Sequence, residues 1–318
     1  MTQTIDLVMF MIWTRLPLLR IINNLVFRIS RGTSTLEILL IKILLLTKKI
    51  RCISNLNIIV IGGCPRSGTT LARALIGMHQ KIACPQQECY FLMNIKNPAI
   101  LKETFDFSLE EINKLGGKYE DIVSFAENVL RLYMQKEGKQ LVALKAPIYV
   151  TIIDELFHHF PNMKFIHVLR DGRDAACSLR TFPKRKIANG EIVPINIRNP
   201  FDWGIRLWVS CVNRGRKWMK SDRYIEVKYE DLVNDSVNTV KRIFDFLGVE
   251  MPDKNQLLSF YKYEKGERHP QNIEVGRPIY KTAIGRMKTD MSENEKEMFK
   301  YLAGEMLMEL GYEKDLDW

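Results

Sequence analysis

The fold of this chain is decided by the stretch Gly63-Cys64-Pro65-Arg66-Ser67-Gly68-Thr69-Thr70, GCPRSGTT at residues 63–70. Residues 57–61 before it form a short apolar run rich in isoleucine and valine, and residues 69–78 after it have a helical pattern. Glycines spaced G-x4-G between a strand and a helix, followed by a hydroxyl residue, are typical of a loop that cradles phosphate. The helix N-terminus adds partial positive charge. The stretch therefore predicts an anion site; the alternative is a glycine-rich turn without a ligand.

The cation of this loop is unusual for a nucleoside-triphosphatase. In that class a lysine directly follows the second glycine, whereas here Thr69 stands in that place and the cation is Arg66. Without the lysine, a triphosphate beside magnesium would be poorly neutralised. A planar guanidinium instead suits the oxygens of a single 5′-phosphate group. We expect a nucleotide site, and the pattern implies no metal.

The rest of the chain alternates strands and helices, which predicts an α/β fold with a parallel sheet flanked by helices. The remaining strands are expected at 141–144, 164–169 and 224–227, and helices around 150–160, 174–179 and 232–247. Residues 89–138 read as a mostly helical insertion, with a capping box at Ser108 and Glu111. A second capping box, at Ser292 and Glu295, opens the last helix. Residues 181–200 are expected to be a long loop that carries the basic triplet 184–186.

Taken together, GCPRSGTT, HVLRDGRDAACS at 167–178 and VKYEDL at 227–232 resemble the PAPS-dependent sulfotransferases, over residues 57–312. PAPS is 3′-phosphoadenosine 5′-phosphosulfate. The resemblance implies a P-loop-like fold and in-line transfer of a sulfuryl group from PAPS to an acceptor hydroxyl, with adenosine 3′,5′-bisphosphate as the leaving group. It assigns the 5′-phosphosulfate to Arg66, Ser67, Gly68, Thr69 and Thr70.

The resemblance also implies a site for the 3′-phosphate, made by Arg170 at a strand end and Ser178 eight residues later. Ligands of open α/β sheets bind at the carboxyl ends of strands, which suits Arg170. Tyr229 resembles a family tyrosine near the nucleotide, with a core tyrosine as the alternative. Residues 281–288 partly match a basic glycine loop over the 3′-phosphate, which implies Lys281 and Arg286. The match is incomplete because Met287 stands where tryptophan is common.

For the general base, the resemblance favours a glutamate. The cytosolic branch uses a histidine two residues after a lysine, but Lys145 is followed by Ala146 and Pro147. The tyrosyl-protein and glycosaminoglycan branches use a glutamate after the first loop's helix, and Glu88 is the only carboxylate between Gly63 and Glu103. This implies Glu88 as base, with Lys145 and Arg66 on the sulfuryl and bridging oxygens. The alternatives are a solvated loop glutamate and a salt-bridged lysine.

Residues 1–50 form an amphipathic, basic segment apart from the sulfotransferase domain expected at 51–318. Residues 1–51 carry eight basic and two acidic groups, a net +6 out of the chain's +10, which argues against nucleic-acid binding by the body. No uncharged run reaches the ~20 residues of a membrane span. The segment is expected either to pack on the domain or to lie on an anionic membrane surface. A cytoplasmic enzyme, free or at the membrane, is therefore expected.

Several questions stay open in the sequence. The acceptor is a hydroxyl of a peptide tyrosine, a carbohydrate or a lipid-linked molecule. A nucleotide kinase and a non-catalytic nucleotide-binding protein are the rival classes. The six cysteines show no disulfide framework, which favours a reducing compartment, and the Cys84–Cys89 spacing lacks the further ligands of a zinc site.

Overall fold

The computed structural model describes residues 53–93, 98–115, 122–181, 184–188, 191–195, 198–264 and 276–318. A five-stranded sheet has the order β2-β3-β1-β4-β7, and all its pairings are parallel. Its strands are β1 (Ile58–Gly63), β2 (Ile82–Ala83), β3 (Leu141–Lys145), β4 (Lys164–Leu169) and β7 (Tyr224–Lys228). The predicted α/β class is confirmed. The predicted 1–50 segment lies outside the described residues.

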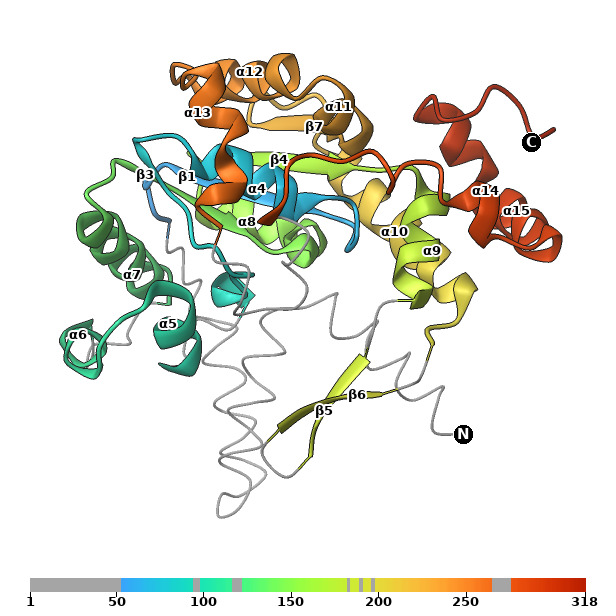
Figure 1. The fold of residues 1–318 in the computed structure, drawn as a ribbon. Helices are drawn as coiled ribbons and strands as arrows, with labels where there is room; N and C mark the ends of the chain where they lie inside the picture. Colours follow the sequence, from blue (N-terminus) through green and yellow to red (C-terminus); the bar gives the residue numbers. More distant parts are fainter. Residues whose placement is uncertain are drawn as a thin grey trace, which may run out of the picture. The chain divides into compact units, whose positions relative to one another are not determined.

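Helices cover both faces of this sheet (Figure 1). On one face, Ile59 and Ile61 pack with α4 (Thr69–Gly77), α12 (Ser236–Leu247) and α13 (Lys254–Leu258). On the other face, β1 contacts η2 (Pro147–Ile152) and α10 (Phe201–Arg216), and Phe165 of β4 contacts Phe157 of α8 (Ile153–His159). Strands buried on both sides read as continuous apolar runs, which is why the sequence revealed them.

The predicted helical insertion is confirmed in its described part. It contains η1 (Phe91–Met93), α5 (Pro98–Phe105), α6 (Leu109–Leu115) and α7 (Ile122–Glu137). The expected capping box is present, because the Ser108 N–H donates to Glu111 Oε2 at 2.7 Å and the Glu111 N–H donates to Ser108 Oγ at 3.1 Å. Rings of Phe91, Phe107 and Tyr133 gather around Phe105 and join these elements.

Three local predictions need correction. The helix expected at 150–160 begins with the 3₁₀ turn η2, and its α-helical part is α8. The helix expected at 232–247 is divided into α11 (Tyr229–Asn234) and α12, because the Asp235 side chain caps α12 by accepting from the Asn238 N–H.

The prediction of a long loop at 181–200 is wrong for the middle of this range. It contains the antiparallel strands β5 (Lys184–Ala188) and β6 (Glu191–Ile195). The missed signal in the sequence is Asn189-Gly190, a pair favoured in two-residue hairpin turns, followed by β-branched residues. The helix α10 that follows was not predicted either.

The C-terminal region contains η3 (Phe260–Lys262), α14 (Met287–Asp290) and α15 (Glu293–Glu309). The predicted capping box of α15 is present at Ser292 and Glu295. Helices α9 (Gly172–Thr181) and α15 both pack against α10, and Trp208 of α10 contacts Phe299 of α15. This packing fixes α9, which follows directly from the end of β4.

The close approach of α10 to β4 depends on a glycine. A Cβ at Gly215 would lie 2.2 Å from Nδ1 of His167, a fully buried ring that is hydrogen-bonded to the Tyr224 hydroxyl at 2.5 Å. A Cβ at Gly204, in the same helix, would meet nothing closer than 3.5 Å. Gly204 is therefore a matched control for a substitution of Gly215, because both lie in α10 and only Gly215 has a close contact.

We expect Gly215→Ala to lower the free energy of unfolding by about 1–3 kcal/mol, because the added methyl overpacks the His167 contact. Gly204→Ala should leave it unchanged or raise it by up to about 1 kcal/mol, since alanine favours a helix. Urea denaturation of both variants measures the difference. Equal stability of the two would contradict this packing.

Candidate active site

The first loop joins β1 to α4 and has a constrained backbone. Arg66 adopts a left-handed conformation with φ of 73°, and its carbonyl accepts a hydrogen bond from Arg170 Nη1 at 2.8 Å. Gly68 has φ of 87°, and a Cβ there would lie 2.2 Å from the Tyr229 ring. The loop therefore needs glycine at position 68. The left-handed conformation of Arg66 is energetically unfavourable, and contacts such as the one from Arg170 offset its cost.

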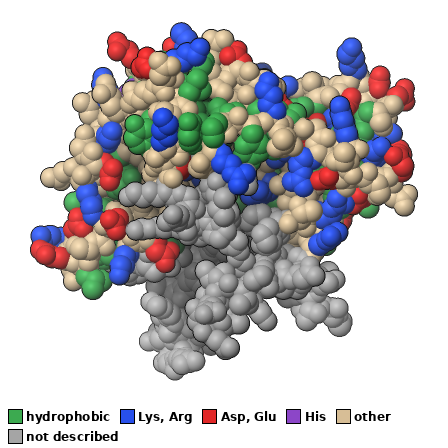
Figure 2. Space-filling model, viewed as in Figure 1, with side chains coloured by type: hydrophobic (Ala, Val, Ile, Leu, Met, Phe, Trp, Pro, Cys, Tyr) green, Lys and Arg blue, Asp and Glu red, His purple; other side chains and the backbone are tan. Residues whose placement is uncertain are grey.

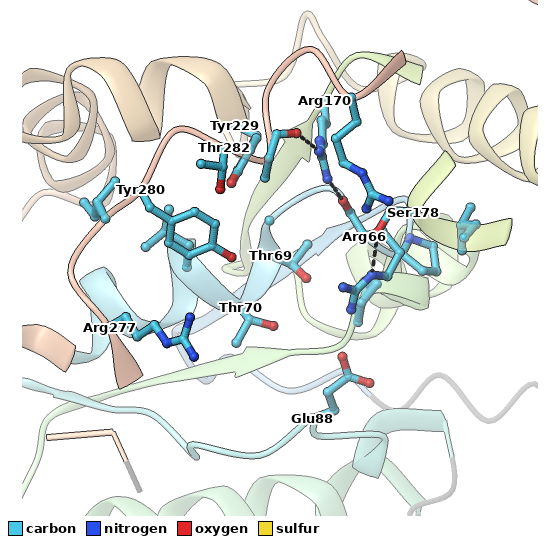
Figure 3. Close-up of a pocket in the computed structure, with 18 of the residues that line it drawn as sticks. Arg66, Thr69, Thr70, Glu88, Arg170, Ser178, Tyr229, Arg277, Tyr280 and Thr282 are labelled. Carbon is cyan, nitrogen blue, oxygen red and sulfur yellow. Dashed lines mark hydrogen bonds between the residues drawn. The ribbon is translucent and has the colours of Figure 1, made fainter. Parts of the chain in front are cut away.

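A cavity of about 580 Å³ opens beside this loop (Figure 3), within the usual size range of small-molecule sites. Its walls include nine of the residues named from the sequence: Arg66, Gly68, Thr69, Thr70, Glu88, Arg170, Ser178, Tyr229 and Arg286. Ser67 and Lys145 are buried next to lining residues, at 0% exposure, and do not form its wall. Lys281 is exposed and is not part of the lining.

Positive charge is concentrated on the wall formed by β1, β4 and their loops. Arg66 Nε donates to Ser178 Oγ at 3.1 Å, which brings the two predicted phosphate sites together (Figure 3). Burial lowers the pKa of Arg66, and the nearby Arg170 lowers it further. Within the described residues, the buried Ser67 Oγ and Arg170 Nε have no hydrogen-bond partner. An anion in the cavity would face Arg66 and Arg170, which both line it, and would relieve the repulsion between them.

An ion pair between the buried Lys145 and the partly exposed Glu88 lies at the opposite side of the loop. Lys145 Nζ donates to Glu88 Oε1 at 2.9 Å and to Thr70 Oγ1 at 3.2 Å. The backbone fixes this pair, since the N–H of Cys89 donates to the Lys145 carbonyl at 2.8 Å. Burial raises the pKa of Glu88, but the Lys145 charge and the hydrogen bonds outweigh burial and hold it below its usual value. Glu88 is therefore an ionised carboxylate at neutral pH.

The remaining predicted residues have mixed surroundings. Tyr229 is both buried, at 7% exposure, and part of the cavity wall, and the Arg170 guanidinium lies 4.9 Å from its ring centre. Arg286 lines the cavity while it pairs with Asp290 at 2.8 Å. The segment that carries Arg286 is fixed by Asp174, whose carboxylate accepts from the N–H groups of Gly285 and Met287 at 2.7 and 2.9 Å.

Four polar residues that line the cavity were not named as site residues from the sequence. Arg277 and Tyr280 precede the partly matched loop at 281–288, Thr282 lies within it, and all three line the cavity (Figure 3). Tyr90 lies two residues after Glu88, and its hydroxyl donates to Glu88 Oε2. No local pattern distinguishes these residues; only the folding of the C-terminal segment over the loop brings the first three to the cavity.

Other kinds of site receive little support from the described part of the chain. It has no group of three or more His, Cys, Asp or Glu arranged to hold a metal ion, and none of its helices is long and apolar enough to cross a bilayer. The cysteines of this part are free thiols. Figure 2 shows acidic and basic side chains interspersed on the face drawn, rather than one basic surface.

Comparison with known proteins identifies the family. Residues 58–253, more than half of the chain, match the Sulfotransferase family, and the chain belongs to it. The predicted family is confirmed. The structure is similar to the sulfotransferase domain of the Synechococcus PCC 7002 olefin synthase, with a TM-score of 0.54 and 19% identity over 80% of this chain and 97% of that one. This similarity supports the fold.

Curated relatives include protein-tyrosine sulfotransferases. The Drosophila melanogaster protein is 25% identical over 208 residues, 63% of this chain and 39% of that protein. Protein-tyrosine sulfotransferase 1 of Rattus norvegicus is 32% identical over 130 residues, 39% of this chain and 34% of that protein. The matched regions thus span little more than a third of these two relatives.

The Glu88–Lys145 pair should contribute to stability in a pH-dependent way. Since its folded pKa is depressed, Glu88 stabilises the fold above its unfolded pKa of roughly 4.3, and this contribution is lost as pH falls through the folded value. At pH 7, Glu88→Gln should cost up to about 3 kcal/mol, because it leaves Lys145 buried without a partner. Glu88→Gln combined with Lys145→Met should cost less than the two single changes together.

Urea denaturation at pH 7 and pH 3 measures this coupling, which should be smaller at pH 3 than at pH 7. The matched control is Asp245→Asn in the exposed Lys241–Asp245 pair, whose side chains are 60% and 62% exposed. That change should cost at most about 0.5 kcal/mol. Additive costs for Glu88 and Lys145 at pH 7 would contradict the pairing.

Proposed function

We propose that the protein transfers a sulfuryl group from 3′-phosphoadenosine 5′-phosphosulfate to an acceptor hydroxyl. The observation that carries the proposal is that cationic groups from two strand ends, Arg66 after β1 and Arg170 after β4, face one cavity. A nucleotide with separate 5′ and 3′ anionic groups fits two such positions. Membership of the Sulfotransferase family supports the same donor.

The binding roles follow from the contacts of each residue. The N–H groups of the 66–70 loop and the hydroxyl of Ser67 would bind the 5′-phosphate, since they lie at the N-terminus of α4. Arg170 and Ser178 would bind the 3′-phosphate, with Arg286 at the edge of the cavity. Tyr229 would orient the nucleotide by its contact with Gly68 and Arg170.

In the transfer step, Glu88 would accept the proton of the acceptor hydroxyl while the hydroxyl oxygen forms a bond to sulfur. The bond between sulfur and the bridging phosphate oxygen breaks, and its electron pair leaves with adenosine 3′,5′-bisphosphate. Lys145 would stabilise the charge that develops on the bridging oxygen, and its hydrogen bonds to Glu88 and Thr70, which both line the cavity, support this role. Arg66 would neutralise the sulfuryl oxygens.

The acceptor would be a hydroxyl of a peptide tyrosine, a carbohydrate or a lipid-linked molecule. Relatives named protein-tyrosine sulfotransferases support the first of these. The basic, apolar residues 1–50 would bring the enzyme to an anionic membrane surface, which favours an acceptor there. A nucleotide kinase is the alternative, and Thr69 in place of the expected lysine argues against it.

Ligand binding tests the donor assignment. Adenosine 3′,5′-bisphosphate should raise the unfolding temperature more than AMP at the same concentration, because AMP lacks the phosphate that Arg170 and Ser178 would bind. Magnesium ATP should have a smaller effect than the bisphosphate. Differential scanning fluorimetry with all three ligands makes the comparison. A preference for magnesium ATP would instead favour the kinase.

The base assignment is tested by Glu88→Gln. We expect the rate of sulfuryl transfer to fall about 10²–10⁴-fold, as is typical for removal of a general base. Affinity for the bisphosphate should change little, and the exposed Glu110→Gln should be fully active. The assay follows transfer from labelled donor to a panel of hydroxyl acceptors. Retention of near-normal turnover by Glu88→Gln would eliminate the assignment.

A further inference from the structure

Both oxygens of the Glu88 carboxylate already have a proton donor in this structure. Lys145 Nζ donates to Oε1 at 2.9 Å, and the phenolic hydroxyl of Tyr90 donates to Oε2. A hydroxyl that transfers its proton to Glu88 must approach one of these oxygens. Each oxygen can accept a second hydrogen bond, but the Glu88 side chain is only 25% exposed, which restricts the directions from which a hydroxyl can approach.

The two donors differ in how easily they can move away. Lys145, the last residue of β3, has a side chain that is 0% exposed and that also donates a hydrogen bond to Thr70 of α4. Tyr90 is 39% exposed and forms part of the cavity wall. Its backbone carbonyl is held by the N–H of Met93 at 3.0 Å, but rotation of the side chain alone would release the hydroxyl. An incoming hydroxyl therefore replaces Tyr90 rather than Lys145.

The phenol also has the same chemistry as the group that replaces it. It offers a single O–H donor to the carboxylate, as an acceptor hydroxyl would. Burial and the Glu88 charge raise the pKa of Tyr90, so the hydroxyl stays protonated at neutral pH. The contact thus keeps the base ionised and its Oε2 oxygen covered.

From this arrangement, and resting on the proposed function, we propose that Tyr90 is a positioning residue that occupies the place of the acceptor hydroxyl on Glu88 until an acceptor displaces it. Water makes fewer contacts than a bound acceptor and displaces Tyr90 poorly. The residue therefore limits transfer of the sulfuryl group to water, a side reaction that a closed site suppresses.

Transfer of the sulfuryl group from PAPS to water gives a test that does not require the natural acceptor. In it, a water oxygen bonds to sulfur and a water proton passes to Glu88. The bond from sulfur to the bridging oxygen breaks, and its electron pair leaves with adenosine 3′,5′-bisphosphate. The products are sulfate and the bisphosphate, and the proton is released to solvent.

Tyr90→Phe keeps the ring and removes the hydroxyl. With PAPS labelled in the sulfuryl group, we expect sulfate release to rise about tenfold, a change that corresponds to roughly 1.4 kcal/mol. The acid limb of its pH profile should move to higher pH, because the Tyr90 hydrogen bond helps to lower the pKa of Glu88. A purely structural role would not move this limb.

Tyr301→Phe is the matched control, because Tyr301 is 89% exposed on α15. Its rate and pH profile should equal those of the wild type, and both variants should bind the bisphosphate within about twofold of it. Sulfate release by Tyr90→Phe at or below the wild-type rate, or an unmoved acid limb, would overturn the proposal for Tyr90.

The wild-type protein separates this failure from failure of the proposed function. If it binds the bisphosphate and releases labelled sulfate while Tyr90→Phe behaves identically, only the role of Tyr90 is lost. If the wild type neither binds the bisphosphate nor consumes PAPS, the proposed function fails and the role of Tyr90 fails with it.

Discussion

Buried positive charge at the carboxyl edge of the sheet is the constraint on which this site depends. Arg170 and Lys145 are 5% and 0% exposed, and burial lowers the pKa of both Arg66 and Lys145. A buried charge is costly without a partner. Glu88 supplies one for Lys145 at 2.9 Å, and Asp174 supplies one for Arg170 at 3.7 Å. Arg66 and Arg170 nevertheless line the same cavity, and the Arg170 charge lowers the pKa of Arg66. A polyanionic ligand in the cavity would offset this repulsion between the two arginines.

The sequence was sufficient for the parts of the fold whose signal is local. The strands at 58–63 and 164–169 are rich in apolar residues because helices cover both faces of the sheet, although the second also contains Lys164 and His167. The capping boxes at Ser108 and Ser292 depend only on residues three positions apart. The α10 helix was missed, although its buried side rests on Gly204, Gly215 and Trp208. Glycine is a poor helix former, and at position 215 it is needed because of the close approach of His167, a tertiary contact.

The same difference between local signals and tertiary contacts separates the site residues that were predicted from those that were not. Arg66, Arg170 and Ser178 belong to recognisable motifs at strand ends, and parallel strands place their carboxyl ends at one edge. Arg277 and Tyr280 reach the cavity through a segment whose path depends on long-range contacts, such as that between Asp174 and Gly285. Lys281, four residues before Gly285, matched a partial motif, but it is exposed and does not line the cavity. A motif identifies a loop more reliably than it identifies which cations of that loop face the ligand.

The most direct measurement of the central claim is a crystal structure with adenosine 3′,5′-bisphosphate. Two separate cationic positions on one cavity predict the 5′-phosphate on the N–H groups of residues 66–70 and the 3′-phosphate between Arg170 and Ser178. The guanidinium of Arg66 should then turn from Ser178 toward phosphate oxygens. Binding of the nucleotide elsewhere, or with its 3′-phosphate in solvent, would contradict the account.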